Sequence, residues 1–128
     1  MRGRGALSDV DDRLVMPALQ VALDGLAQRQ GVTADNVANI QTPGFRARTV
    51  EFEAALADAV AGAPGASADD LAGTIGTGYT SDPAREDGNN VSLENETLFG
   101  TKTNLEYTMA LRVVDSRFGI YRDVLRGA

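Results

Sequence analysis

The chain lacks cysteine, histidine and tryptophan altogether among its 128 residues. Without cysteine it can form neither a disulfide nor a thiolate metal site. Without histidine it lacks the commonest metal ligand and the usual base of Ser–His and Cys–His nucleophilic pairs. We therefore expect no catalytic residue, no cofactor-binding residue, no metal ligand and no small-molecule substrate.

The acidic pairs of the sequence do not alter this expectation. They occur at Asp11–Asp12, Asp69–Asp70 and Glu86–Asp87, in polar, glycine-rich or terminal stretches. A catalytic pair needs a desolvated cleft that separates its two pKa values. We interpret these carboxylates as solvated loop acids.

Excess positive charge and long apolar runs are also missing. The net charge of −6 disfavours nucleic-acid binding, in which Lys and Arg displace counterions from phosphates. No apolar run approaches the roughly 20 residues that span a bilayer. The first fifteen residues hold Asp9, Asp11 and Asp12, where a secretory signal needs an apolar region. We expect no cleaved signal peptide.

Large apolar side chains are scarce. Hydrophobic residues make up 43% of the chain, but many are alanines and aromatics are only 5%. The length fits one domain, residues 1–128. Burial per residue should be modest, so a partner is expected to complete the packing.

The first helix is expected at residues 14–41, after a disordered or turn-like start at 1–13. Leu19, Leu26 and Val37 fall on one face of the 3.6-residue period. Asn36 and Asn39 fall on the opposite face near the helix end. There they satisfy the last orphan carbonyls, cap a neighbouring helix, or are simply polar surface. Thr42-Pro43-Gly44 should end the helix.

The middle of the chain gives weaker signals. Residues 42–61 are interpreted as a loop followed by a short helix, with Phe52, Leu56 and Val60 on one face and Gly62 as its end. Residues 62–90 are rich in Gly, Ala, Ser and Pro, which predicts a flexible segment. A short hairpin around Thr74–Thr80 is a weak alternative.

The second long helix, at 91–126, has the clearest pattern. Ser92 is a plausible N-cap. Two apolar ridges follow at helical spacing. The first ridge comprises Tyr107, Leu111, Val114, Phe118, Tyr121 and Leu125. The second ridge comprises Leu105, Met109, Val113, Ile120 and Val124. One surface helix needs only one such stripe, so one ridge should face the same chain and the other a neighbouring chain.

Two stretches carry a family resemblance. Residues 26–30 and 35–45 resemble the N-terminal signature of flagellar axial proteins, with matching positions at Asn36, Ala38, Asn39, Thr42, Pro43, Gly44 and Phe45. Residues 87–91, continuing to Leu93, Glu96 and Tyr107, resemble the C-terminal segment of a proximal-rod family, with matching positions at Asp87, Gly88, Asn89 and Val91. A sister rod family shares only the first signature in this form.

The resemblance implies a mainly α fold. Its long N- and C-terminal amphipathic helices would pair as an elongated, coiled-coil-like domain around a Gly/Pro/Ala-rich flexible middle. It also implies a subunit of the flagellar basal-body rod, exported without a cleaved signal. Its partners would be copies of itself, other rod proteins, the rod-to-membrane-ring adaptor and the export gate. The rival hypothesis is a non-exported helical adaptor or chaperone that binds a partner's amphipathic helix.

Overall fold

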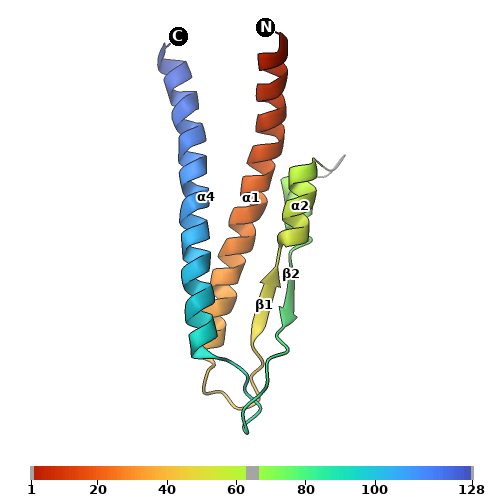
Figure 1. The fold of residues 1–128 in the computed structure, drawn as a ribbon, viewed down its shortest axis with the longest axis vertical. Coiled ribbons are helices and arrows are strands. Elements are labelled where there is room, and N and C mark those ends of the chain that lie inside the picture. The colour runs from red at the N-terminus through yellow and green to blue at the C-terminus, as the bar shows by residue number, and fades with distance from the viewer. Residues whose placement is uncertain (1, 63–66, 128) are drawn as a thin grey trace.

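The fold is built around two long helices. The computed structural model describes residues 2–62 and 67–127, and the side chains of residues 16–62, 67 and 69–127. Helix α1 (Arg2–Ala38) and helix α4 (Leu93–Gly127) lie side by side along the long axis, with both termini at one end, so they run antiparallel (Figure 1). The predicted fold class is confirmed: the chain is mainly helical and its long terminal helices pack together.

Helix α1 begins much earlier than the predicted start at residue 14. It runs from Arg2 and continues through Pro17. Because proline has no N–H, Pro17 removes one helix hydrogen bond without ending the helix. The glycines near the start hid the helical period, yet each costs only about 1 kcal/mol relative to alanine. At the other end α1 stops at Ala38, and hydrogen-bonded turns continue to Thr42.

Helix α4 agrees closely with its predicted range. Ser92 is its N-cap, as predicted: its hydroxyl accepts a hydrogen bond from the Asn95 N–H at 3.3 Å. Glu94 and Glu96 lie in the first turn, where carboxylates interact favourably with the helix dipole. None of the described helices combines the length and apolar content needed to cross a membrane.

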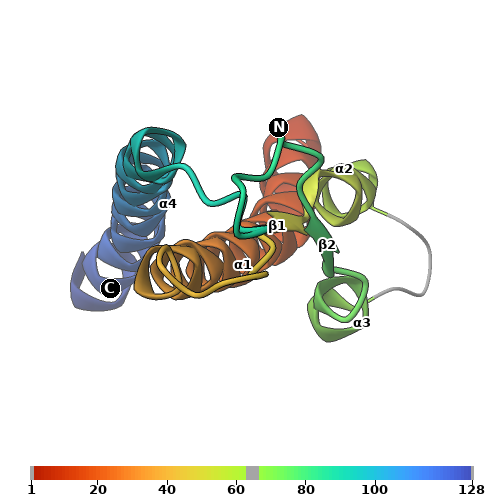
Figure 2. The ribbon, with the colours of Figure 1, turned by 90° about the horizontal axis from the view of Figure 1, so that it is seen from below.

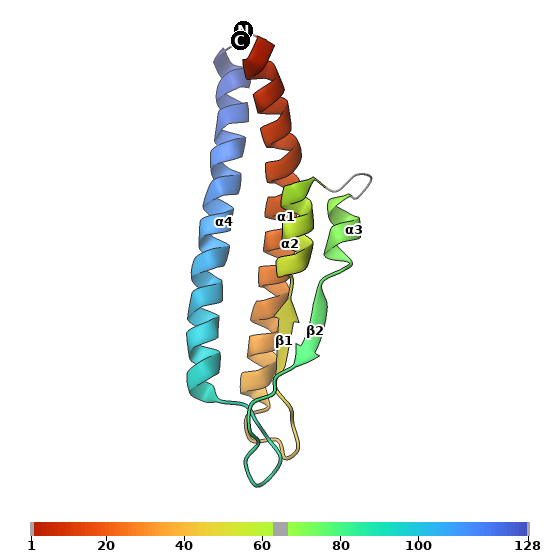
Figure 3. The same cartoon turned by 45° about the vertical axis from the view of Figure 1, so that its right-hand side comes forward.

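The middle segment has little regular structure, but it is more ordered than the sequence suggested. Strand β1 (Arg48–Glu51) precedes helix α2 (Glu53–Ala61), helix α3 (Ala68–Ala72) and strand β2 (Gly76–Tyr79). Residues 48–51, expected to lead into a helix, are a strand antiparallel to β2, with Thr49 opposite Gly78. A strand does form within Thr74–Thr80, but it pairs with residues 48–51, so the suggested local hairpin is wrong. Residues 63–66 of the segment predicted to be flexible lie outside the described part (Figure 3).

Helix α1 lies between α4 on one side and the β1–β2 ribbon with α2 and α3 on the other (Figure 2). The buried apolar residues sit mainly on this second side. One cluster comprises Val21, Ala55, Ala59 and Leu71, and another comprises Leu26, Val50 and Phe52. Helix α4 contributes to them only the partly buried Tyr107. The helix with the two apolar ridges therefore contributes little to the buried core of its own chain.

The short helix α2 packs through small residues. Ala55 and Ala59 are buried, whereas Val60, expected on the packing face, is 56% exposed. Gly62 ends α2 in the left-handed conformation at φ 65°, which confirms the predicted stop. The inward alanines allow α2 to approach α1 closely.

A glycine in α1 makes a second close approach possible. A Cβ added to Gly25 would overlap the Phe52 ring and lie 2.7 Å from Phe52 Cβ. The Arg29 guanidinium lies over the same ring, 4.5 Å from its centre. Gly31, six residues further along α1, has no atom within 4 Å of such a Cβ. A side chain at Gly25 would therefore collide with Phe52, whereas a side chain at Gly31 would meet open space.

We expect Gly25→Ala to lower the free energy of unfolding by about 1–2 kcal/mol, because overpacking outweighs the gain in helix propensity. Gly31→Ala, its matched control, should raise that free energy by up to about 1 kcal/mol. Urea unfolding followed by circular dichroism measures both. If the two variants shift in the same direction, the close contact between Gly25 and Phe52 is not a constraint on the fold.

Candidate functional site: a junction of two loops

The two signature stretches meet in space at the end of the molecule opposite the termini. The loop that follows α1, residues 39–47, and the loop that precedes α4, residues 80–92, lie together at the bottom of Figure 1. We call residues 39–45 and 85–91 of these loops the junction. It joins the C-terminal end of α1 to the N-terminal end of α4.

Two glycines allow the junction loops to touch through their backbones. Gly44 N–H donates to the Asp87 carbonyl at 2.8 Å, and Asn90 N–H donates to the Phe45 carbonyl at 3.3 Å. Gly44 and Gly88 adopt φ values of 76° and 84°, which side chains disfavour. A Cβ on Gly88 would also lie 3.3 Å from the Gly44 Cα. Both positions therefore need glycine.

Asn89 closes the end of α1 from a distant part of the sequence. It is fully buried. Its Nδ2 donates to the carbonyls of Asn39 and Thr42, each at 2.8 Å, and its Oδ1 accepts from Val91 N–H at 2.8 Å. Carbonyls near a helix end lack helical donors. The Asn89 amide supplies such donors with both of its N–H groups, and its oxygen also has a partner.

Asn90 and Arg85 extend the same network. Asn90 Oδ1 accepts from Ala47 N–H at 2.6 Å, and its Nδ2 donates to Thr80 Oγ1 and to the Asp82 carbonyl. Arg85 donates to the carbonyls of Val91 and Ile40, at 2.6 and 2.5 Å. Neither residue was singled out from the sequence. Asn90 lies within the recognised stretch, but Arg85 gives no signal because a lone arginine in a polar loop looks solvated.

Asn36 binds α1 to both β1 and α4. It is 1% exposed, so its interpretation as polar surface is wrong. Its Oδ1 accepts from Arg48 N–H at 3.1 Å, and its Nδ2 donates to the Arg48 carbonyl at 2.9 Å and to Glu96 Oε1 at 3.1 Å. Arg29 Nη2 likewise donates to the Val50 carbonyl at 2.6 Å. Side chains of α1 thus bind the edge of β1 that faces away from β2.

The remaining signature residues have smaller roles. Asn39 Nδ2 donates at 2.8 Å to the Asp35 carbonyl near the helix end, which also accepts from the Asn39 N–H. Thr42 donates to Asn39 Oδ1, and Asp87 Oδ1 accepts from Asn89 N–H. Val91 is buried, Phe45 half-buried, and Ala38 and Pro43 exposed.

The residues proposed for helix packing divide by location. In α1, Leu26 is buried, Leu19 is half-buried and Val37 is 38% exposed. In the first ridge of α4, Tyr107 and Val114 are half-buried and the other members are exposed. Every member of the second ridge is exposed: Leu105, Met109, Val113, Ile120 and Val124. The first ridge is therefore the one that partly faces the same chain.

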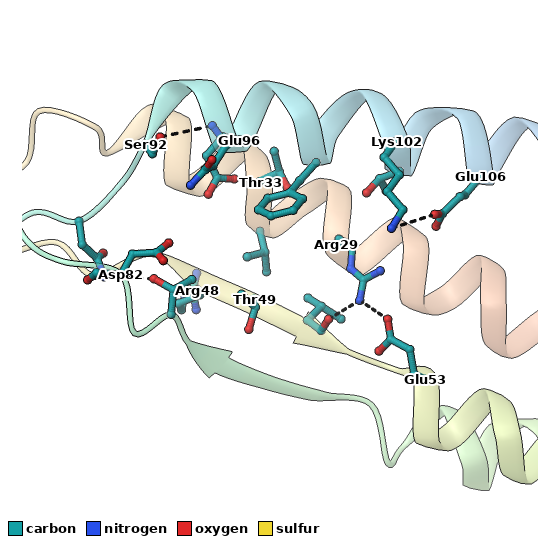
Figure 4. Close-up of a pocket in the computed structure, with 17 residues that line it drawn as sticks. Arg29, Thr33, Arg48, Thr49, Glu53, Asp82, Ser92, Glu96, Lys102 and Glu106 are labelled. Carbon is teal, nitrogen blue, oxygen red and sulfur yellow. Dashed lines mark hydrogen bonds and ion pairs between the residues drawn. The ribbon is translucent and has the colours of Figure 1, made fainter.

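A cleft of about 280 Å³ lies beside the junction, between the first turns of α4, α1 and β1 (Figure 4). Within residues 2–62 and 67–127 no three acidic side chains gather to hold a metal ion. The lining bases Arg29, Arg48 and Lys102 are paired with Glu53, Asp35 and Glu106 respectively. In this region side chains form hydrogen bonds with backbone N–H and carbonyl groups, and these bonds fix how α1, β1 and α4 lie together.

Two carboxyl groups of the cleft have opposite pKa shifts. Burial raises the pKa of Glu96 above its ordinary value; the hydrogen bond from Asn36 opposes this, and the charge of Asp82 adds to it. Burial also raises the pKa of Glu53, but hydrogen bonds from Arg29 and from backbone N–H groups outweigh it, so the net pKa is lowered.

These shifts predict opposite pH dependences. Folded Glu96 binds its proton more tightly than unfolded Glu96, so it lowers stability increasingly as pH rises from the ordinary value of about 4.3 through the raised pKa. Glu96→Gln removes this destabilisation, so the free energy of unfolding of the variant should increase relative to that of the parent as pH rises. Urea unfolding at several pH values between about 3 and 7 measures the trend.

Glu53→Gln is the matched control. Because the folded pKa of Glu53 is lowered, its contribution is present above the ordinary value and is lost as pH falls through the lowered pKa. The free energy of unfolding of this variant should therefore fall relative to that of the parent as pH rises. Parallel trends for the two variants would contradict the assigned environment of Glu96.

Comparisons with known proteins agree with the two signatures. The sequence model of the family described as "Flagella basal body rod protein" matches residues 18–46, which include the end of α1 and the first junction loop. The flagellar basal body rod protein FlgB of Borrelia hermsii is 53% identical over 38 residues, which cover 30% of this chain and 28% of that protein.

Longer matches extend over most of the chain. FlgB of Aeromonas hydrophila is 29% identical over 118 residues, covering 84% of this chain and 89% of that protein. FlgB of Salmonella typhimurium is 32% identical over 124 residues, covering 84% of this chain and 90% of that protein. These matches confirm the resemblance seen in the signatures, and the chain belongs to the FlgB family of flagellar basal body rod proteins.

Proposed function

We propose that the chain is a structural subunit of the proximal rod, which polymerises through its terminal helices and transmits torque from rotor to hook. It leaves the cell interior through the flagellar export gate without a cleaved signal. Its neighbours are copies of itself, other rod proteins and the adaptor that joins the rod to the membrane ring. Flagellum-dependent motility requires it.

The observation that carries this proposal is the uncovered second ridge of α4. Leu105, Met109 and Val124 are 62–65% exposed, and Val113 and Ile120 are 43% and 54% exposed. Isolated apolar residues are normal on a protein surface, but a contiguous apolar patch marks an interaction site. These five residues follow one face of a 35-residue helix, so the patch is long, with Ser116 and Arg117 in the one turn that it skips. A neighbouring subunit is the natural cover for it.

The location of the core supports the same conclusion. The chain buries most of its apolar side chains between α1 and the middle segment. Helix α4 meets α1 at the small or polar residues Gly100 and Asn104, and packs only Tyr107 of its first ridge against the cluster of Leu26. Helix α4 is therefore held in place by its own chain while its apolar ridge remains available. This arrangement suits a subunit that is folded before it assembles.

The adaptor hypothesis also accounts for an exposed apolar ridge. It differs in the fate of the protein, because an adaptor stays in the cell and a rod subunit becomes part of the basal body. Membership of the rod-protein family favours the rod subunit. The residues give the adaptor hypothesis no separate support.

A strain that lacks the gene should form neither hooks nor filaments, and the parent gene should restore both. Val113→Asp should fail to restore motility, because it places a charge on the second ridge. The purified variant should nevertheless be as helical and as stable as the parent. Electron microscopy of cells, swimming assays and urea unfolding provide the three measurements.

Val114→Asp is the matched control within the same turn. Val114 is half-buried, so this variant should also lose stability as a monomer, by up to about 1.5–3 kcal/mol. Thr108→Asp, on the polar strip of α4, should restore swimming. Hooks and filaments in the deletion strain, without a duplicate gene, would disprove the rod assignment.

A further inference from the structure

The two edges of the β1–β2 ribbon differ in their hydrogen bonding. At the outer edge of β1, the N–H and the carbonyl of Arg48 both bind the side chain of Asn36, and the Val50 carbonyl accepts from Arg29. Side chains of α1 thus occupy this edge. Strand β2 lies on the other side of β1, at the margin of the molecule (Figure 2, Figure 3). Its outer edge therefore faces away from both long helices.

The register shows which backbone groups of β2 point outwards. Thr80 N–H donates to the Ala47 carbonyl at 2.9 Å, and hydrogen-bonded and non-hydrogen-bonded pairs alternate along an antiparallel ladder. The two glycines of β2 therefore direct their backbone groups to β1, whereas Thr77 and Tyr79 direct theirs to the outer edge. Within residues 2–62 and 67–127, no hydrogen bond reaches the N–H or the carbonyl of either residue.

Strand β2 lacks most of the features that protect an edge from pairing with another chain. Edge strands are commonly blocked by charged side chains, by proline or by a bulge. The sequence of β2, Gly-Thr-Gly-Tyr, has no charge and no proline, and its register with β1 is regular. An open edge of this kind binds an extended peptide, whose main chain supplies the missing hydrogen bonds. The four residues of β2 limit such pairing to a short segment.

Arg46 indicates the charge of that segment. Its guanidinium lies over the Tyr79 ring, 4.5 Å from the centre, and no described carboxylate forms an ion pair with it. A hollow of about 380 Å³ lies beside the ring, lined by these two residues and by Gly44, Phe45 and Arg48. Residues opposite each other on neighbouring strands have Cβ atoms about 4.5–5.5 Å apart on the same face. A carboxylate opposite Tyr79 on an added strand would therefore reach Arg46.

We propose that the outer edge of β2 pairs with an extended segment of a different protein, in which an acidic residue opposite Tyr79 binds Arg46. A second copy of this chain does not fit the site in this way, because β2 carries no acid and both edges of β1 are already bonded. The contact uses none of the apolar ridges of α4. It therefore goes beyond the proposed rod function and does not rest on it.

A synthetic peptide tests the edge on the purified chain. The probe is an acetylated and amidated peptide of sequence Thr-Val-Glu-Val-Thr, titrated into isotope-labelled protein and followed by nuclear magnetic resonance. The amides of Thr77 and Tyr79 should shift and exchange more slowly with solvent, because the peptide main chain binds them. The same peptide with lysine in place of glutamate should bind about three- to tenfold more weakly, because Arg46 repels it.

Three variants separate the edge from the fold. Thr77→Pro removes an N–H from the outer edge and none from the pairing with β1, so it should keep the parent's urea midpoint and lose peptide binding. Gly78→Pro, the matched control, removes an N–H that binds β1 and should lower the midpoint. Arg46→Glu should keep the midpoint and reverse the preference, so that the lysine peptide binds more tightly than the glutamate peptide. In the deletion strain, Thr77→Pro and Arg46→Glu should both fail to restore swimming.

Four results would overturn the inference. They are unchanged Thr77 and Tyr79 amides at saturating peptide, equal affinity of parent and Arg46→Glu for both peptides, and full swimming with both variants. The fourth is protection of the two amides that grows with protein concentration in the absence of peptide, which would identify a second copy as the occupant. None of them bears on the rod function, which depends on the hooks and filaments of the deletion strain.

Discussion

Side-chain amides hold the end of α1 to the start of α4, and the rest of the structure depends on that attachment. Asn89 binds two carbonyls near the end of α1, and Asn36 binds the edge of β1 and the carboxylate of Glu96. A buried polar group left unpaired costs about 1–3 kcal/mol. The observed arrangement of the loops leaves no buried side-chain polar atom of the described residues without a partner, so the amides help to specify how the elements lie as well as stabilising them.

The attachment explains where apolar surface remains. Because the junction and Asn36 help to position α4, only part of its first ridge, including Tyr107, packs against its own chain. The buried clusters lie instead on the opposite side of α1, against α2, α3 and β1. The second ridge of α4 is consequently free along its length. A chain with few aromatics can thus fold with a small core and leave an apolar ridge exposed.

Local signals in the sequence predicted local features well. Ser92 as an N-cap and Gly62 as a helix stop depend on residues a few positions away, and the ridges of α4 follow from helical spacing alone. Features formed between distant residues were missed. The pairing of β1 with β2 joins residues 48–51 to 76–79, and Asn36 is buried by partners at Arg48 and Glu96. Its spacing placed it on a polar face because periodicity cannot show which polar residue will meet another segment. The signatures identified the junction residues as a group, but their hydrogen-bonding roles required the fold.

Native-state amide hydrogen exchange tests the central role of the junction most directly. The informative amides are Gly44, which donates to the Asp87 carbonyl, and Ala47 and Val91, which donate to the side chains of Asn90 and Asn89. If the junction holds the fold together, these loop amides open only with global unfolding, with the same opening free energy as the amides of Val21 and Leu26 in α1. Rapid exchange at the three loop amides while α1 remains protected would contradict the account.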